Sequence, residues 1–192
     1  AIPFNVLPKP VSNFAFPDTV CLPNAYITFA NLSSIFDGSE NLFQYRWIFD
    51  DPLSGPANSS TLKTPTHVYT DTGQYQVYLR VTSNGGCVKD TTILVNTIHP
   101  QPKINFGISK PDICRGDAVF LTDSTNRMDG TTVQWNWDLG DGRIRNTKNV
   151  LYIYTGPQTY QVSLNTVNSF GCKSGTLTKP LIVHSYPTVH AG

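Results

Sequence analysis

The fold of this chain is decided by a stretch in its second half, Trp135-Asn136-Trp137-Asp138-Leu139-Gly140-Asp141-Gly142. Trp135 and Trp137 are two positions apart, so in an extended strand both side chains point to the same face of a sheet. The Gly-Asp-Gly sequence that follows predicts a tight turn, because glycine reaches backbone angles that other residues avoid. The stretch therefore predicts a half-buried strand that runs into a turn.

The same order of motifs occurs twice in the 192 residues, which indicates a repeated domain. The matching segments are 45–51, 67–69, 75–81 and 86–87 in the first block and 135–142, 152–154, 160–164 and 171–172 in the second. Proline-containing junctions also repeat, at 8–11 and 100–103, and Pro187 begins a third. We therefore expect two whole repeats of a longer array, with domains at 10–98 and 99–186 and flanking segments at 1–9 and 187–192.

Hydrophobic residues alternate in short runs separated by clusters of Gly, Pro, Asn, Asp and Ser, a pattern typical of all-β sandwiches without significant helix. We expect strands near 11–17, 25–31, 43–49, 65–69, 74–83 and 88–98, and near 102–108, 117–122, 132–138, 143–154, 159–168 and 173–184. The side chains expected inside are Trp47, Tyr75, Val77, Leu79 and Val81 in the first block and Trp137, Tyr160, Val162 and Leu164 in the second.

The composition argues against two classes of partner. The formal net charge is +1, only 14% of the residues are charged and there is no basic run, so we expect no nucleic-acid binding. No apolar run reaches the roughly 18 residues that a spanning helix needs, so we expect no membrane insertion. The chain begins without Met and without a signal-peptide pattern, which favours a segment of a longer protein.

The four cysteines, Cys21, Cys87, Cys114 and Cys172, lack the CxxC spacing of zinc and thiol redox sites. We therefore expect disulfides, which indicate an oxidising compartment outside the cytosol. Of the three connectivities that four cysteines allow, the repeat favours Cys21–Cys87 and Cys114–Cys172, because each pair encloses one block. Free, buried thiols in a cytosolic protein are the alternative.

The motifs closely resemble the hallmark of the PKD (polycystic kidney disease) domain, W-D-F-G-D-G followed by H-x-Y-x-x-x-G-x-Y-x-V. The resemblance covers both blocks and implies an immunoglobulin-like β-sandwich for each. It also implies structural roles for the residues that match the hallmark: Trp47, Tyr69 and Tyr75, and Trp137, Asp138, Gly140, Asp141, Gly142, Tyr154 and Tyr160.

Each block departs from the hallmark in a different half. The first block has Asp50-Asp51-Pro52 in place of the Gly-Asp-Gly turn, whereas the second has Tyr152 in place of the family's His and Gln158 in place of its Gly. The paired cysteines and the junction at 187–192 also resemble PKD arrays in large secreted or surface proteins of Bacteroidetes-type bacteria.

Acidic residues in turns are the main candidates for chemistry. Asp138 and Asp141 have the ligand type for Ca²⁺ or for acid–base catalysis, but carboxylates in such turns more often accept hydrogen bonds from the backbone. The same choice applies to the acidic residues of the first block: Asp37, Glu40, Asp50 and Asp51. We expect no resident cofactor, with bound Ca²⁺ as the alternative.

The histidines, at positions 67, 99, 184 and 190, have no metal-site or triad spacing, and His67 matches the structural His of the PKD hallmark. The chain also lacks GxSxG, phosphate-loop and dinucleotide-binding motifs. We therefore expect no enzymatic activity.

Arg46, Tyr78 and Arg80 form the candidate binding surface, because alternation places them on the outer face of two neighbouring strands. Aromatic residues and Arg are enriched where binding energy concentrates. An ordinary solvated sheet face is the alternative. The matching face of the second block is rich in amides and hydroxyls: Gln134, Asn136, Asp138, Gln161, Ser163 and Asn165.

These features predict a non-catalytic structural and adhesive spacer in a large exported bacterial protein, located outside the cell or at its surface. The expected partners are an extracellular protein or polysaccharide and the neighbouring repeats of the same chain. Two prolines in the junction 98–102 limit bending between repeats. The alternative is a carbohydrate- or protein-binding accessory module of a secreted hydrolase.

Overall fold

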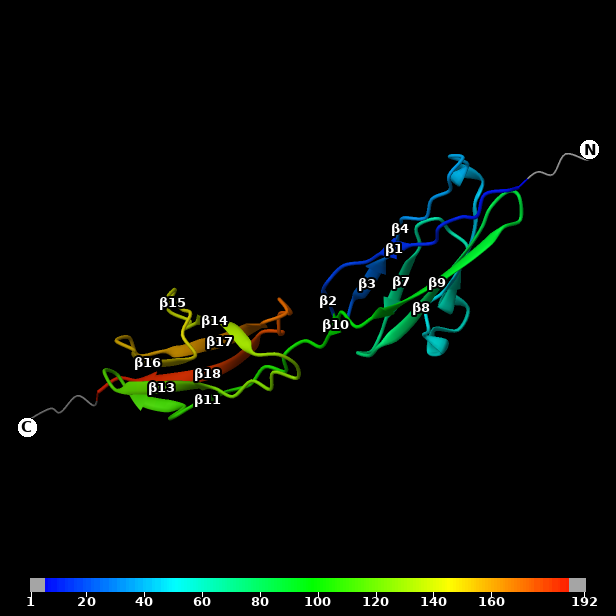
Figure 1. Cartoon of the computed structure of the whole chain (residues 1–192). Helices are drawn as coiled ribbons and strands as arrows, with labels where there is room; N and C mark the ends of the chain where they lie inside the picture. Colours follow the sequence, from blue (N-terminus) through cyan, green and yellow to red (C-terminus); the bar gives the residue numbers. More distant parts are fainter. Residues whose placement is uncertain (1–5, 187–192) are drawn as a thin grey trace, which may run out of the picture. The chain divides into compact units, whose positions relative to one another are not determined.

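The structure, a computed structural model, describes residues 6–186 and divides the chain into two compact units, 1–99 and 100–192 (Figure 1). We call these units the first and second domains. In the described part of each, the regular secondary structure consists almost entirely of strands, as the sequence predicts. The predicted segment 187–192, with His190, lies outside the described residues.

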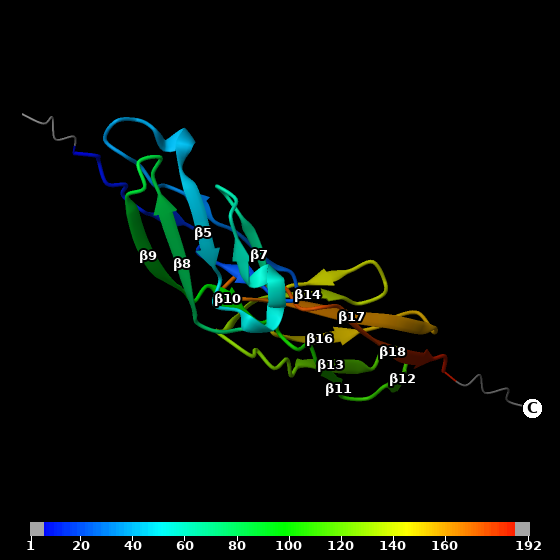
Figure 2. The ribbon, with the colours of Figure 1, turned by 90° about the vertical axis from the view of Figure 1, so that its right-hand side faces the viewer.

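The main sheet of the first domain is antiparallel, with strand order β6-β5-β8-β9. Its strands are β5 (Gln44–Ile48), β6 (Ser59–Ser60), β8 (Tyr75–Thr82) and β9 (Val88–Val95), and Figure 2 shows β5, β8 and β9 side by side. Three two-stranded pairs complete the domain: β1 (Phe14–Ala15) with β4 (Ala30–Asn31), β3 (Ala25–Thr28) with β7 (Thr66–Tyr69), and β2 (Val20–Cys21) with β10 (Ile98–His99).

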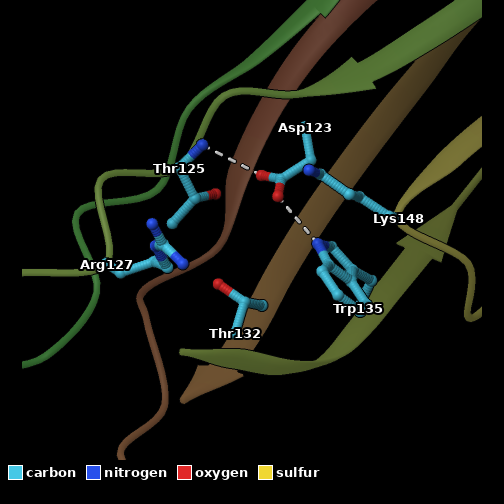
Figure 3. A pocket seen from close by; sticks show the side chains of 6 residues that line it. All are labelled: Asp123, Thr125, Arg127, Thr132, Trp135 and Lys148. Carbon is cyan, nitrogen blue, oxygen red and sulfur yellow. Dashed lines mark hydrogen bonds between the residues drawn. The ribbon is translucent and has the colours of Figure 1, made fainter. Parts of the chain in front are cut away.

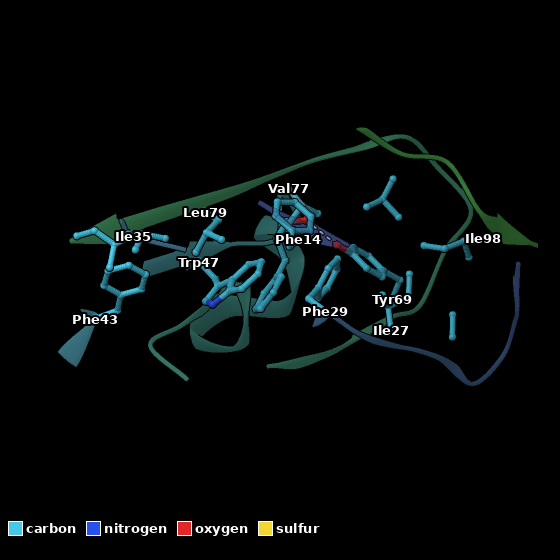
Figure 4. Packing of buried hydrophobic residues seen from close by; sticks show 14 residues of the cluster. Phe14, Ile27, Phe29, Ile35, Phe43, Trp47, Tyr69, Val77, Leu79 and Ile98 are labelled. Carbon is cyan, nitrogen blue, oxygen red and sulfur yellow. Dashed lines mark hydrogen bonds between the residues drawn. The ribbon is translucent and has the colours of Figure 1, made fainter. Parts of the chain in front are cut away.

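The core of the first domain is packed around Trp47, whose ring is fully buried. The Phe14 ring meets it edge-on, with centroids 5.1 Å apart, and Phe29 packs beside both (Figure 4). The predicted inner residues Val77, Leu79 and Val81 are also fully buried, and Tyr75 packs against the core while partly exposed. The predicted inward face of β5 and β8 is therefore confirmed.

The second domain repeats this arrangement with longer strands. A five-stranded sheet contains β12 (Asp112–Cys114), β18 (Leu177–His184), β17 (Thr159–Asn168), β14 (Thr132–Asp138) and β15 (Ile144–Arg145). A three-stranded sheet contains β11 (Phe106–Ile108), β13 (Ala118–Asp123) and β16 (Asn149–Ile153). Phe106 packs edge-on against Trp137 at 5.1 Å, and the predicted inner residues Tyr160, Val162 and Leu164 are buried.

Three predicted strands are each divided, and one of them, 25–31, forms β3, which pairs with β7, and β4, which pairs with β1. The segment 143–154 forms β15, which pairs with β14, and β16, which pairs with β13 in the other sheet. The segment 88–98 likewise forms β9 and the start of β10, which belong to different pairs. Short 3-10 helices, η1 (Glu40–Leu42) and η2 (Pro52–Asn58), occupy loops of the first domain, and no α-helix occurs within residues 6–186.

The predicted disulfide pairing is wrong. Cys87 and Cys114 carry free thiols, whereas Cys21 and Cys172 are disulfide-bonded. Because each predicted pair contains one free thiol, neither Cys21–Cys87 nor Cys114–Cys172 is formed.

Strand register explains this correction. Cys21 pairs with His99, beyond the Val95 end of β9, whereas Cys87 lies in the turn that precedes β9. The eight residues of β9 span about 25 Å, but a disulfide requires Cα atoms within about 7 Å. In the second domain, Cys114 pairs with the last residue of β18, and Cys172 lies in the loop that connects β17 to the other end of β18.

Candidate functional site

The hallmark tryptophans are structural parts of the two cores. Trp47 Nε1 donates a hydrogen bond to the Leu62 carbonyl at 2.9 Å, and Trp137 Nε1 donates to the Thr147 carbonyl at 3.0 Å. Both rings are completely buried. A ligand at the surface therefore reaches neither ring.

The hallmark carboxylates of the second domain shape the turn after β14. Asp138 Oδ1 accepts a hydrogen bond from the Gly140 amide at 2.9 Å, and Asp141 Oδ1 accepts one from the Arg143 amide at 3.1 Å. The other oxygen of Asp141 accepts a hydrogen bond from the Tyr152 hydroxyl at 2.6 Å. Asp138 and Asp141 therefore act in this turn as backbone and hydroxyl acceptors.

The first domain uses different residues at the same place. His67 Nε2 lies 3.0 Å from Asp51 Oδ2, and the His67 ring stacks on Phe49 at 4.5 Å in a nearly fully buried position. Asp50 Oδ2 accepts a hydrogen bond from the Gln76 amide at 2.8 Å. These contacts explain how Asp50 and Asp51 replace the Gly-Asp pair of the hallmark.

The hallmark tyrosines fasten each turn to its core. The Tyr69 hydroxyl donates to the Phe49 carbonyl at 2.9 Å, and the Tyr154 hydroxyl donates to the Leu139 carbonyl at 2.8 Å. Burial raises the pKa of both hydroxyls above its ordinary value. The rings of Tyr75 and Tyr160 pack against Tyr69 and Tyr154 at 4.1 and 4.3 Å. All four tyrosines therefore belong to the domain interior or its edge.

The acidic residues of the first domain do not gather into one cluster that could hold a metal. Asp37 Oδ1 accepts hydrogen bonds from the amide and the hydroxyl of Ser39, and Glu40 Oε1 accepts one from the Ile35 amide. These hydrogen bonds lower the pKa of both carboxyls. Within residues 6–186, no three His, Cys, Asp or Glu side chains are arranged to ligate a metal ion.

Arg46, Tyr78 and Arg80 lie together on the outer face of the main sheet of the first domain, and we call them the arginine face. Arg46 is opposite Arg80 in the β5–β8 register and is exposed. Arg80 Nε and Nη2 donate to the two carboxylate oxygens of Asp90 at 2.8 and 2.9 Å, and its guanidinium lies 5.9 Å from the Tyr78 ring centroid. Sequence reasoning missed Asp90, although a β8–β9 hairpin would have placed it opposite Arg80.

The matching face of the second domain is a chain of amides. Gln134 Nε2 donates to Asn136 Oδ1, and Asn136 Nδ2 donates to Asn165 Oδ1, both at 2.9 Å. Asn146 Nδ2 also donates to Asn136 Oδ1 at 3.1 Å. The amides therefore bond to one another, and the residues predicted for this face, Gln134, Asn136, Asp138, Gln161, Ser163 and Asn165, include no arginine or aromatic residue.

A pocket of about 300 Å³ opens on the second domain where β13, β14 and the loop after β15 meet (Figure 3). Its lining residues are Asp123, Thr125, Arg127, Thr132, Trp135 and Lys148. The half-buried Trp135 ring donates its Nε1 hydrogen to Asp123 Oδ2 at 2.8 Å. Sequence reasoning used Trp135 to define the strand but missed the pocket, because its lining comes from three separate segments.

The described residues contain no helix long and apolar enough to cross a membrane.

Residues 8–98 and 99–183 each match the family described as PKD domain.

A curated relative and two solved structures are similar to the chain. The pre-pro-metalloprotease PrtV of Vibrio cholerae is 32% identical over 146 residues, which are 73% of this chain and 14% of that protein. The crystal structure of the PKD1 domain from the same metalloprotease matches 44% of this chain and 98% of that one, at 23% identity and a TM-score of 0.39. A structure of carbohydrate-binding modules from the β-sandwich superfamily matches 44% of this chain and 35% of that one, at 30% identity and a TM-score of 0.42.

Proposed function

The chain belongs to the PKD domain family, and on that premise we propose that it is a non-catalytic structural and adhesive segment of a large exported bacterial protein. It spaces the neighbouring parts of that protein and contacts an extracellular protein or surface through the arginine face.

The main support is the use of the hallmark polar groups within the domains. Asp138, Asp141 and the buried tyrosines bind the backbone or one another, so they maintain the turns and do not face a substrate. The arginine face, by contrast, combines an exposed guanidinium with a partly exposed aromatic ring. Such groups carry much of the binding energy in protein interfaces.

Two observations favour a location outside the cytosol. Cys21 and Cys172 are disulfide-bonded, and structural disulfides persist mainly in oxidising compartments. The similar PrtV is named as a pre-pro-metalloprotease, and a precursor form of this kind is typical of exported enzymes.

The proposal is tested by retention of the whole chain on immobilised collagen, chitin and cellulose. We expect retention on at least one of them, weakened about tenfold by Arg46→Ala or Tyr78→Ala, since truncation of a central contact costs about 1–2 kcal/mol. Gln161→Ala, an exposed position on the matching face of the second domain, is the control. Retention that neither first-domain substitution changes, or no retention at all, contradicts an adhesive role for the arginine face.

A second candidate function is carbohydrate binding as an accessory module of a secreted hydrolase. The pocket of the second domain favours it, because a tryptophan, two hydroxyl side chains and charged groups meet in one hollow. Its volume of about 300 Å³ lies at the lower end of the range of about 300–1,000 Å³ that is usual for ligand pockets.

A further inference from the structure

The second-domain pocket contains two cations and one carboxylate, and the carboxylate is already engaged. Asp123 Oδ1 accepts a hydrogen bond from the Thr125 amide at 2.9 Å, and Oδ2 accepts the one from Trp135 Nε1. Asp123 therefore fixes the loop and the orientation of the indole. Figure 3 shows this carboxylate between Thr125 and Trp135, with Arg127 on the opposite side of the pocket from the indole.

Arg127 and Lys148 are available to a ligand. Both side chains are exposed, and neither forms a hydrogen bond or ion pair with any side chain or backbone group in residues 6–186. A guanidinium binds a carboxylate with two parallel hydrogen bonds, and an ammonium adds a third donor. The pocket therefore favours an anionic group.

The first domain shows that the fold does not require this pocket. The Asn31–Ser33 amide contact repeats the Asp123–Thr125 contact, and the bridge between Val11 and Ser34 repeats the bridge between Lys103 and Asn126. These matches place Ile35 at the position of Arg127, and the alignment of Trp47 with Trp137 places Tyr45 at the position of Trp135.

Ile35 is only 7% exposed and joins the core of the first domain, and Tyr45 packs edge-on against Phe43 at 6.1 Å. Lys63 is the counterpart of Lys148. The Trp47 indole donates to the carbonyl of the residue before Lys63, and the Trp137 indole donates to the carbonyl of the residue before Lys148. Residues that fill this place in the first domain are thus replaced in the second by a cation and a larger, fixed aromatic ring.

We propose that the pocket binds a uronate unit of an acidic polysaccharide. The sugar carboxylate lies between Arg127 and Lys148, one C–H face of the pyranose ring contacts the Trp135 indole, and Thr132 bonds to a sugar hydroxyl. An indole combines a large apolar face with a rigid orientation, which suits a flat sugar ring. This inference rests on the second candidate function, carbohydrate binding, and is independent of the arginine face.

The test uses the indole N–H signals of the whole ¹⁵N-labelled chain, which has three tryptophans. Addition of trigalacturonate should shift the signal of Trp135, while Trp47, which is fully buried in the first domain, serves as the internal control. Arg127→Gln and Lys148→Gln should each weaken the affinity at least about tenfold, because a charged hydrogen bond is lost. Lys63→Gln, the counterpart in the first domain, should leave the affinity unchanged.

Two further ligands, an acidic peptide and a neutral sugar, test whether the pocket requires a uronate. Equal affinity for triglutamate would assign the pocket to acidic peptides, and equal affinity for neutral maltotriose would remove the role of the cations; either result overturns the proposal. Trigalacturonate binding that Arg127→Gln and Lys148→Gln leave unchanged would reject this pocket while retaining carbohydrate binding. No binding of the chain to any saccharide would reject the second candidate function itself.

Discussion

The Tyr152 hydroxyl donates a 2.6 Å hydrogen bond to Asp141 in the second domain, at the place where His67 and Asp51 lie 3.0 Å apart in the first. In both domains the contact joins the turn after the tryptophan strand to a neighbouring strand, β7, which ends at the buried Tyr69, or β16, which ends one residue before the buried Tyr154. The exchange of His for Tyr, a departure from the family hallmark, therefore preserves the contact with a different donor.

Removal of this donor should destabilise the second domain. Tyr152→Phe leaves Asp141 with one hydrogen bond fewer, and we expect a loss of about 1–2 kcal/mol in the free energy of unfolding. Urea unfolding followed by the amide NMR signals of β14 and β17 measures this loss. Tyr186→Phe, at a second-domain side chain that is 60% exposed, should change the stability by less than about 0.5 kcal/mol. Equal effects of the two substitutions would show that the Asp141 contact adds no stability.

The turn itself depends on Gly140. This residue has a φ of +78°, and a Cβ added here would lie 2.8 Å from the backbone nitrogen of Gln161. Gly140→Ala should therefore cost about 3 kcal/mol, from a left-handed alanine together with a clash against backbone. Gly142, at φ +85°, has no atom within 4 Å of the added Cβ, so Gly142→Ala should cost only about 1 kcal/mol. Urea unfolding of both variants compares these costs, and the explanation fails if Gly142→Ala is the more damaging change.

The strands and cores could be predicted from the sequence because they depend on local alternation. Val77, Leu79 and Val81 follow one another at every second position, and all three are fully buried. The change of sheet between β15 and β16 could not be predicted. Both segments have strand-like composition, and they differ only in the strands with which they pair.

The pocket and the cysteine pairing needed three-dimensional information. Asp123, Trp135 and Lys148 come from three segments, and nothing in their sequence spacing indicates that they line one hollow. The sequence predicts a pairing of Cys21 with Cys87 because the two residues enclose one repeat. Separation in sequence does not measure distance across a hairpin, however, and the length of β9 keeps this pair apart.

The corrected cysteine assignment predicts two reactive thiols. Under denaturing, non-reducing conditions, iodoacetamide should modify Cys87 and Cys114 only, and prior reduction should expose Cys21 and Cys172 as well. Peptide mass spectrometry identifies the modified residues. Cys87→Ser should lower the non-reduced count by one, whereas Cys21→Ser should not lower it. Four modified cysteines before reduction, or none, would contradict the assignment.

The Arg80–Asp90 pair should make a small part of the stability depend on acidic pH. The two hydrogen bonds from Arg80 lower the pKa of the Asp90 carboxyl in the folded state. A depressed folded pKa contributes stability that is present above the unfolded pKa of about 3.9 and is lost as pH falls through the folded pKa. Because both side chains are 43% exposed, solvent screening keeps this contribution small.

Carboxyl NMR of the folded chain measures the Asp90 titration directly. The titration covers about pH 2 to 6, on both sides of the unfolded pKa of about 3.9. Arg80→Gln should raise the Asp90 pKa toward its ordinary value and remove the acid-dependent loss. Arg46→Gln removes a neighbouring charge that makes no hydrogen bond to Asp90, so it should leave the titration nearly unchanged. If Arg46→Gln raised the Asp90 pKa as much as Arg80→Gln, the shift would arise from the summed charge of the arginine face, and the two hydrogen bonds would not be its cause.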